Sequence, residues 1–282
     1  MKEAKQKKPN IFLRLLTFLL TLALILGAVA LVVYRDRINL DAFQRWLSYR
    51  GLETSETGEA APFSYGGGTS VDLGCLDGAL LFSSNNSIRL YSNNGTELYS
   101  EVLSLSNPVL NTSGALGIVY DMGGQELRTY NNREQVFSLT LSEGYGLLSA
   151  RPNQSGWLAV TAQQSRYKGV VTVYDNKFSP KMELRYSSDF LVDAALSEDS
   201  RQVAAVTMGQ GDESFESRVI LYALGQEEPL STVSLGNTTV LDLCYGQSVI
   251  RALGETSLSL LTGDGAAVNT YHFSDRYLKG YD

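Results

Sequence analysis

The sequence predicts an all-β fold, a β-propeller of four-stranded blades that occupies residues 71–282. Three observations lead to this prediction. Short apolar runs alternate with turn-forming residues after Val71, the same four-strand unit recurs along the chain, and no long amphipathic helix interrupts the series. A repeat of about 40 to 45 residues with four strands per unit is the sequence signature of propeller blades.

The third strand of each unit carries the clearest marker, an aliphatic residue or threonine followed by tyrosine. The markers end at Tyr91, Tyr130, Tyr174 and Tyr222, and Leu261 takes the equivalent place in the last unit. The successive spacings are therefore 39, 44, 48 and 39 residues. A spacing this regular indicates five similar units rather than a set of unrelated hairpins.

Two families of polar turns keep the same register. First and second strands are joined by NTSGA (111–115), PNQSGW (152–157) and SEDSRQ (197–202), and third and fourth strands by segments such as SNNG (92–95) and GDG (263–265). Asn, Asp, Ser and Gly tolerate the backbone conformations that close hairpins. Glu198 and Asp199 are therefore interpreted as turn formers and not as catalytic acids.

Five units fit between Val71 and Asp282, and the final YLKGYD (277–282) resembles the opening of another first strand. Propellers normally close on themselves, because an open ring leaves strand edges exposed. Two interpretations stand, a closed five-bladed ring and an incomplete ring that belongs to a longer chain. We expect the second, because of that unfinished ending.

The N-terminal region predicts a membrane anchor. Residues 15–34 are 20 consecutive residues without a charge, enough for a transmembrane helix, and residues 1–14 form a basic tail. The positive-inside rule places this tail in the cytoplasm. We therefore expect a single-pass protein of the cell membrane, held in the lipid bilayer, with the propeller outside the cytoplasm. The alternative is a cleaved signal peptide, for which Ala28-Val29-Ala30 offers a cleavage site.

Two segments connect the anchor to the propeller. Residues 38–52 place Leu40, Phe43, Trp46 and Leu47 at helical spacing, which predicts a short juxtamembrane amphipathic helix. This helix lies either at the lipid interface or against the next domain. Residues 53–70 are rich in small and polar residues with three consecutive glycines, and are interpreted as a flexible linker.

Charge is distributed unevenly along the chain. The formal net charge is −7, but residues 1–34 hold five basic side chains against one acidic, and the remainder holds 18 basic against 29 acidic. An acidic body is repelled by phosphate backbones, so nucleic acid is not expected as a partner.

The strand-SxDS-strand rhythm and the VYD segment (173–175) resemble the WD40-like and quinoprotein-like propeller superfamily, without its Trp-Asp or Gly-His signatures. The order of basic tail, anchor, INLDAFQRWLSYR helix (38–50), Gly-rich linker and blades is similar to an uncharacterised bacterial family of membrane-anchored propeller proteins. That resemblance covers nearly the whole chain. It implies an architecture and supplies no catalytic residues.

The sequence contains little that indicates catalysis. His272 is the only histidine and lies in an alternating run, which indicates an outer strand rather than a general base or a multi-histidine metal site. Nucleotide-binding loops, G-x-S-x-G and HExxH are all missing from the sequence. We therefore expect a protein that is not an enzyme and has no catalytic residue, no cofactor and no metal. Chemistry through paired carboxylates alone remains an alternative.

The candidate binding residues lie in two connections between second and third strands. QQSRYKG (163–169) supplies Arg166, Tyr167 and Lys168, and MGQGDESFESR (208–218) supplies Asp212, Glu213 and Glu216. Both segments are expected as loops on one common face of the propeller, an aromatic and cationic loop beside an acidic one. The acidic loop is either a binding surface for a basic partner or calcium, or a solvated hairpin.

Cys75 and Cys244 are the only cysteines, and both fall in predicted first strands. We expect two buried free thiols, and a disulfide that closes the ring is the alternative.

The function expected from these observations is a binding or scaffold module of the bacterial cell envelope, whose partner is an unidentified envelope protein or glycan. The alternative is a propeller enzyme that acts on envelope glycans through paired carboxylates. A sensor is less favoured, because residues 1–14 are too short for a folded output domain.

Overall fold

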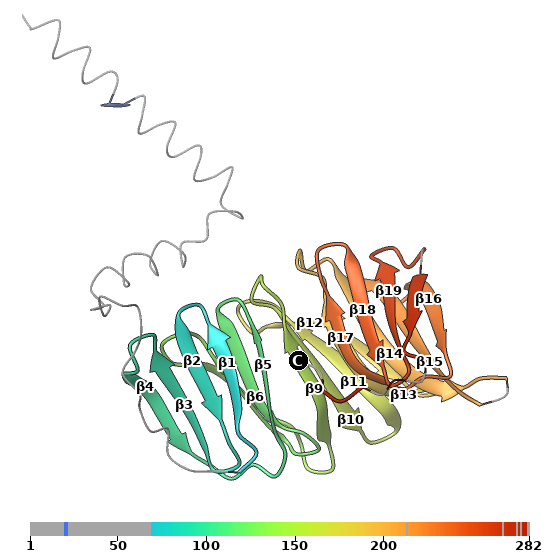
Figure 1. Cartoon of the computed structure of the whole chain (residues 1–282). Helices are drawn as coiled ribbons and strands as arrows, with labels where there is room; N and C mark the ends of the chain where they lie inside the picture. The colour runs from blue at the N-terminus through green and yellow to red at the C-terminus, as the bar shows by residue number, and fades with distance from the viewer. Residues whose placement is uncertain are drawn as a thin grey trace, which may run out of the picture. The chain divides into compact units, whose positions relative to one another are not determined.

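The computed structural model describes residues 20–21, 69–212, 214–266, 268–274, 276 and 278–280. Five four-stranded antiparallel sheets follow one another along the chain, each built from four consecutive strands (Figure 1). The first sheet contains β1 (Asp72–Leu76), β2 (Ala79–Ser83), β3 (Ser87–Ser92) and β4 (Glu97–Val102), and the second contains β5 (Pro108–Ser113), β6 (Leu116–Asp121), β7 (Glu126–Tyr130) and β8 (Gln135–Thr140). The third contains β9 (Gly146–Pro152), β10 (Leu158–Gln164), β11 (Tyr167–Tyr174) and β12 (Pro180–Tyr186). The fourth contains β13 (Phe190–Leu196), β14 (Gln202–Gln210), β15 (Phe215–Ala223) and β16 (Pro229–Gly236), and the fifth contains β17 (Val240–Tyr245), β18 (Val249–Gly254), β19 (Ser257–Thr262) and β20 (Val268–His272).

The all-β, four-strand repeat predicted from the sequence is confirmed, and the sheets are arranged as propeller blades. The third-strand markers at Tyr91, Tyr130, Tyr174 and Tyr222 lie in β3, β7, β11 and β15, and Leu261 lies in β19. The segment SEDSRQ forms the turn from β13 to β14, where Asp199 accepts hydrogen bonds from the Ser197 hydroxyl and the Arg201 amide.

The predicted N-terminal elements fall outside the described residues. Leu20 and Thr21 are the described part of the expected membrane segment 15–34, and the expected helix at 38–52 and nearly all of the linker at 53–70 are not described. Among the described residues, no helix has the length and hydropathy to cross a membrane.

The strand sequences follow from how many neighbours cover each strand. Middle strands such as β6 and β14 are sandwiched between adjacent sheets, so almost every side chain is buried and the sequence is a continuous apolar run. Fourth strands such as β8 and β12 alternate between more exposed and less exposed residues, because one side faces solvent. The strand β20 is exposed along its whole length, which agrees with the outer position expected for His272.

Four apolar clusters hold consecutive sheets together. Fully buried Leu81 and Leu90 pack with Tyr130 between the first two sheets, and Leu243 and Ile250 pack on the fourth sheet at the last junction. Each such side chain contributes about 1.5 to 3 kcal/mol through burial. Gly117 permits the close approach of the first two sheets, since an added Cβ would lie 2.6 Å from Leu81 Cδ2.

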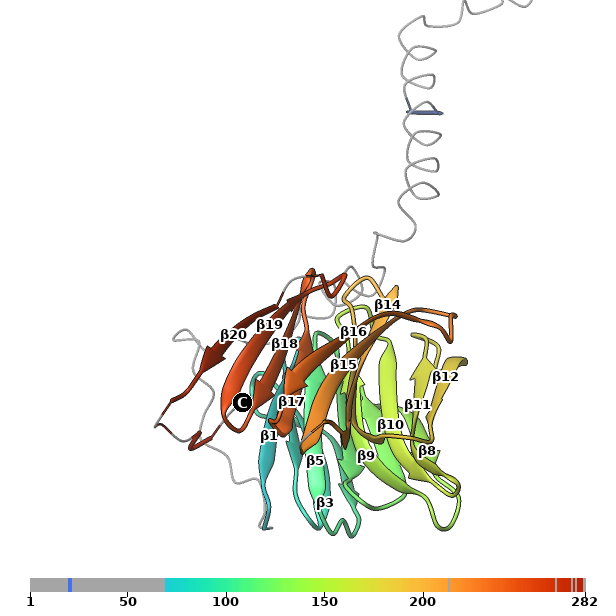
Figure 2. The ribbon, with the colours of Figure 1, turned by 90° about the vertical axis from the view of Figure 1, so that its right-hand side faces the viewer.

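The first strand of each sheet lies beside the first strand of the next, and the strands of the fifth sheet spread outward from β17 to β20 (Figure 2). Within the described residues, no buried cluster joins the fifth sheet to the first. We call the side of the fifth sheet that faces away from the fourth the seam face. Strand register places Val249, Leu260 and Tyr271 on it, and all three are exposed.

The two cysteines lie in β1 and β17 as predicted, but the expectation that both are buried is wrong. Cys75 is exposed, Cys244 is half-buried, and both are free thiols. The reason is the alternation of strand residues: Leu76 and Leu243 face the neighbouring sheets, so each cysteine points away from its neighbour.

Candidate functional site

The candidate site lies on the side of the domain that carries two kinds of connection. The links between second and third strands and the links between successive sheets meet there, because antiparallel strands return the chain to that side at both points. We call this side the loop face. Main-chain hydrogen bonds tie the two kinds of link together, for example from the Leu105 amide to the Asn85 carbonyl and from the Glu255 amide to the Thr239 carbonyl.

The two segments expected as binding loops are mostly strand. The strand β10 runs to Gln164 and β11 resumes at Tyr167, so the link is the two-residue turn 165–166. In the fourth sheet, β14 and β15 pair up to Gln210 and Phe215. The expectation of loops is therefore wrong for most of these residues, because paired backbone hydrogen bonds extend both hairpins and place Tyr167, Lys168 and Glu216 in strands.

A depression of about 470 Å³ surrounds the turn in the third sheet. We call it the arginine depression. Its lining residues are Tyr145, Gln164, Ser165, Arg166, Tyr167 and Arg185. The Arg185 guanidinium lies 5.7 Å from the centre of the Tyr167 ring, a cation–π contact that holds both side chains in place. Arg166 has a φ of 75°, in the left-handed region, and the residue is exposed.

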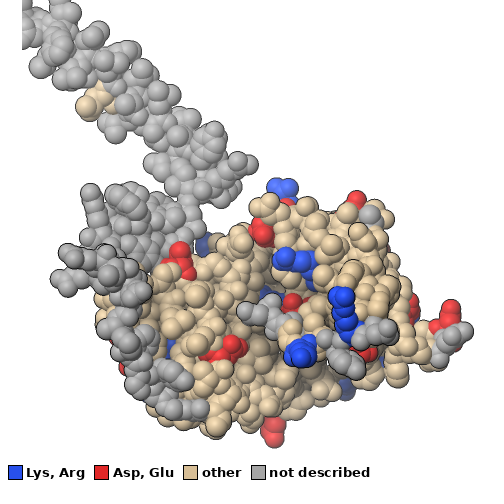
Figure 3. Space-filling view, viewed as in Figure 1, with Lys and Arg blue, Asp and Glu red and all other residues tan. Residues whose placement is uncertain are grey.

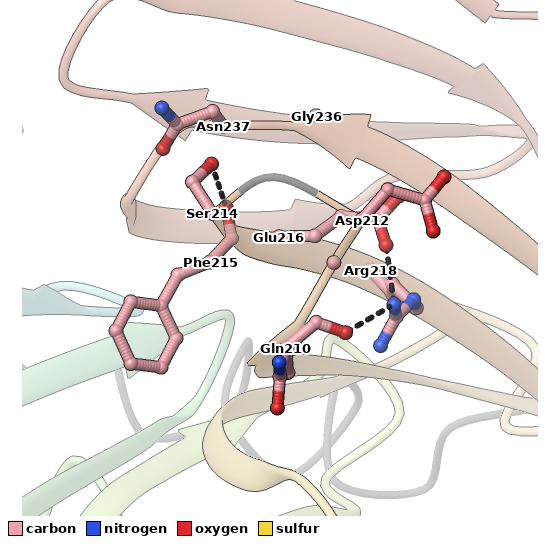
Figure 4. Close-up of a pocket in the computed structure, with 9 residues that line it drawn as sticks. Gln210, Asp212, Ser214, Phe215, Glu216, Arg218, Gly236 and Asn237 are labelled. Atoms are coloured by element: carbon pink, nitrogen blue, oxygen red, sulfur yellow. Dashed lines mark hydrogen bonds and ion pairs between the residues drawn. The ribbon is translucent and has the colours of Figure 1, made fainter.

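A second depression of about 560 Å³ lies at the hairpin of the fourth sheet (Figure 4). Its lining includes Asp212, Glu216 and Arg218, together with Phe215, whose ring points away from Arg218 in the figure. Arg218 donates hydrogen bonds to the Glu216 carboxylate and, at 3.2 Å, to the Gln210 carbonyl. The Phe215 side chain is 63% exposed, so an apolar ring is presented beside an ion pair.

The link between β12 and β13 connects the two depressions. Arg218 pairs with Asp189 at 3.1 Å, and the Lys168 ammonium donates to the Ser188 carbonyl while lying 4.6 Å from the centre of the Phe190 ring. The Phe190 side chain is 49% exposed. Candidate residues from two blades thus lie on one strip of the loop face, in which basic and aromatic groups of the third sheet adjoin charged groups of the fourth.

Glu216 is held in its ionised form. The Ser234 hydroxyl donates to its carboxylate and Arg218 pairs with it, and these contacts lower the pKa of Glu216 although partial desolvation opposes them. Asp212 is exposed, and Glu213 lies outside the described residues. Over the part of the chain that the structure describes, no group of three or more His, Cys, Asp or Glu side chains forms a possible metal site.

A second polar cluster lies among the first strands, where Arg151 of β9 joins three sheets. Its guanidinium lies 2.7 Å from Asp193 Oδ2 of β13 and 2.5 Å from Asp242 Oδ1 of β17. Burial by itself would lower the pKa of Arg151, but the two carboxylates outweigh burial and raise it. The Ser149 hydroxyl and the Ala194 amide donate further hydrogen bonds to Asp193.

The same cluster bears on the paired-carboxylate alternative. Asp193 and Asp242 converge in space, as that chemistry requires, but a permanently charged guanidinium lies between them. Both carboxylates are occupied by ion pairs with Arg151, so neither is free to contact a substrate as a general acid or base. The geometry therefore supports a structural ion-pair cluster that joins the third, fourth and fifth sheets.

The sequence reasoning missed several residues of the strip, among them Tyr145, Arg185 and Asp189. Arg185 and Asp189 lie near the end of a fourth strand and in the link that follows it, and Tyr145 ends the preceding link between sheets. The four-strand repeat places the links between sheets on the same side as the turns between second and third strands. Residues in or beside those links could therefore have been included as candidates from the sequence.

Charge does not form one large patch on the side of the domain drawn in Figure 3. Most of that surface is uncharged, and basic and acidic side chains are interspersed on it. Electrostatic attraction there is local rather than domain-wide.

The five consecutive four-stranded sheets place this domain in the β-propeller class of folds. The chain belongs to a family of unknown function, DUF5711, whose model matches residues 54–271.

Solved structures resemble this chain at low sequence identity. The hydrazine synthase of Kuenenia stuttgartiensis is 9% identical, with a TM-score of 0.56 over 77% of this chain and 72% of that chain. Hsv2 of Kluyvelomyces marxianus is 12% identical, with a TM-score of 0.49 over 75% and 74% of the two chains. The likeness to the hydrazine synthase concerns the fold alone. Comparison with curated protein sequences finds no match.

Proposed function

We propose that this protein is a binding or scaffold module of the bacterial cell envelope, held in the membrane by residues 15–34 with its propeller outside the cytoplasm. The observation that carries the binding role is the strip on the loop face. Two adjacent blades present depressions there, and exposed Phe190 and Phe215 lie beside charged groups. Such a combination of apolar rings and charges is typical of binding surfaces.

Site-specific photo-crosslinking in intact cells tests the binding role. A photoreactive phenylalanine analogue replaces Tyr167 or Phe215 on the loop face, and replaces Lys177 in the turn between β11 and β12 as the matched control. Lys177 is exposed and belongs to the same blade as Tyr167, but lies on the opposite face. We expect discrete crosslinked products from the two loop-face positions only. Equal products from all three positions, or none, would refute a binding role for the strip.

Membrane placement is tested separately by adding protease to cells whose cytoplasmic membrane is intact but whose cell wall or outer membrane has been made permeable. We expect the acidic body to be digested and the basic tail to be protected. A protected body with a digested tail would reverse the proposed topology without affecting the binding role.

A further inference from the structure

The arginine depression differs from the rest of the domain in its charge. Its lining contains Arg166 and Arg185 and no acidic residue, although the whole chain has a net charge of −7. Among the described residues, Arg166 forms no ion pair and Arg185 forms one, with Glu183. The depression therefore presents positive charge that the protein itself does not fully neutralise, which favours an anionic ligand.

The position of Arg166 supports a role for its side chain. A φ of 75° lies in the left-handed region, which glycine and asparagine adopt at lower cost than arginine. Arginine therefore does not stabilise the backbone conformation of this two-residue turn. What arginine supplies there is a guanidinium fork at the edge of the depression, and this fork matches the two oxygens of a carboxylate.

Two aromatic rings and two neutral polar groups complete the lining. Tyr145 and Tyr167 are half-buried, and Tyr167 is held by its contact with Arg185. The ring face that Arg185 does not cover can pack against the flat apolar face of a sugar ring, while the tyrosine hydroxyl, Gln164 and Ser165 offer hydrogen bonds to sugar hydroxyls. A flexible acidic peptide side chain offers no such flat face, so this combination favours a glycan over a peptide.

We infer that the arginine depression binds a carboxylated sugar unit of an anionic polysaccharide, with the carboxylate between Arg166 and Arg185 and the sugar ring against Tyr167. This inference rests on the proposed binding function and names its ligand class. An open depression of about 470 Å³ on the loop face suits one unit of a chain that passes across the surface.

Isothermal titration calorimetry on the full chain in detergent provides the test, with a galacturonic acid tetramer as the probe. A neutral galactose tetramer and a hexaglutamate peptide serve as the comparison ligands. We expect binding of the acidic tetramer, at least about tenfold tighter than either comparison ligand. Equal affinity for the neutral tetramer, tighter binding of hexaglutamate, or no binding of the acidic tetramer would overturn the inference.

Two variants locate the site. Arg166→Asn retains a residue that tolerates the positive φ, so the hairpin is expected to fold, and affinity for the acidic tetramer should fall at least about tenfold. Arg201→Gln removes an exposed arginine on the opposite face and should leave affinity unchanged. Unchanged affinity in Arg166→Asn, or equal losses in both variants, would place the sugar elsewhere. If crosslinking at Tyr167 and Phe215 succeeds while the tetramer does not bind, the ligand class is wrong and the binding function stands.

Discussion

Replacement of Arg151 by methionine should strongly destabilise the domain, because it leaves two carboxylates without their shared cation. The Arg151 and Asp193 side chains are 24% and 8% exposed. Removing one partner of a buried ion pair costs about 3 to 5 kcal/mol. The lower end applies here, because Arg151 is partly hydrated and Asp193 keeps the hydrogen bonds from Ser149 and Ala194. For a domain of this size, a loss of about 3 kcal/mol lowers the melting temperature by roughly 6 to 12 °C.

Circular dichroism melts of the full chain measure this loss. The double variant Arg151→Met/Asp193→Asn removes the orphaned buried charge and should recover roughly half of it. Arg201→Met is the matched control: Arg201 is 84% exposed and lies 3.8 Å from Asp199, so its loss should change stability by less than about 0.5 kcal/mol. A melting temperature for Arg151→Met equal to that of the control, or a double variant less stable than the single one, would refute the reasoning.

Three further predictions follow from local geometry. Gly117→Ala places a Cβ 2.6 Å from Leu81 Cδ2 and 2.9 Å from Leu76 Cδ2, so urea denaturation should show a free energy of unfolding lower by about 1 to 3 kcal/mol. Gly280→Ala, where the added Cβ has no neighbour within 4 Å, should leave the free energy of unfolding unchanged. Ser234→Ala should raise the pKa of Glu216 towards its ordinary value, because the hydrogen bond from the Ser234 hydroxyl is the largest cause of its lowering. In the native protein, the ion pair between Glu216 and Arg218 should be complete above the ordinary pKa and should be lost as the pH falls through the lowered pKa. NMR titration of the Glu216 carboxyl carbon measures both pKa values. Exposed Cys75 should react with maleimide faster than half-buried Cys244, and mass spectrometry of the native protein should place the first adduct on Cys75; preferential labelling of Cys244 would contradict the strand orientation.

Much of the blade structure was predictable from local sequence. The tyrosine markers and the polar turns are set by residues close together in the chain, and each turn such as 197–201 contains its own hydrogen-bonding groups. Alternation then assigns side chains to the two faces of each strand. These features need no knowledge of how the sheets pack against one another.

The candidate site was predictable only in part, because it depends on residues brought together from different strands. Arg166 and Tyr167 stand out in sequence, but Arg185 comes from the next strand, β12, and Tyr145 from the link before β9. The ion pair of Arg151 with Asp242 spans 91 positions. The loops expected at residues 163–169 and 208–218 are mostly strand for a related reason, since polar residues on an exposed hairpin are as compatible with strand pairing as with a loop.

Each of the five sheets consists of one uninterrupted stretch of chain, and no described strand is exchanged between the first and last sheets. A blade can therefore form its three hairpins without any later part of the chain, and then dock on the blade before it. The stability of the domain is then the sum of the stability of each blade and of its contacts with the neighbouring blades, as in other repeat arrays. A gene segment that encodes one blade can therefore be duplicated or deleted in evolution while disturbing only the two junctions beside it.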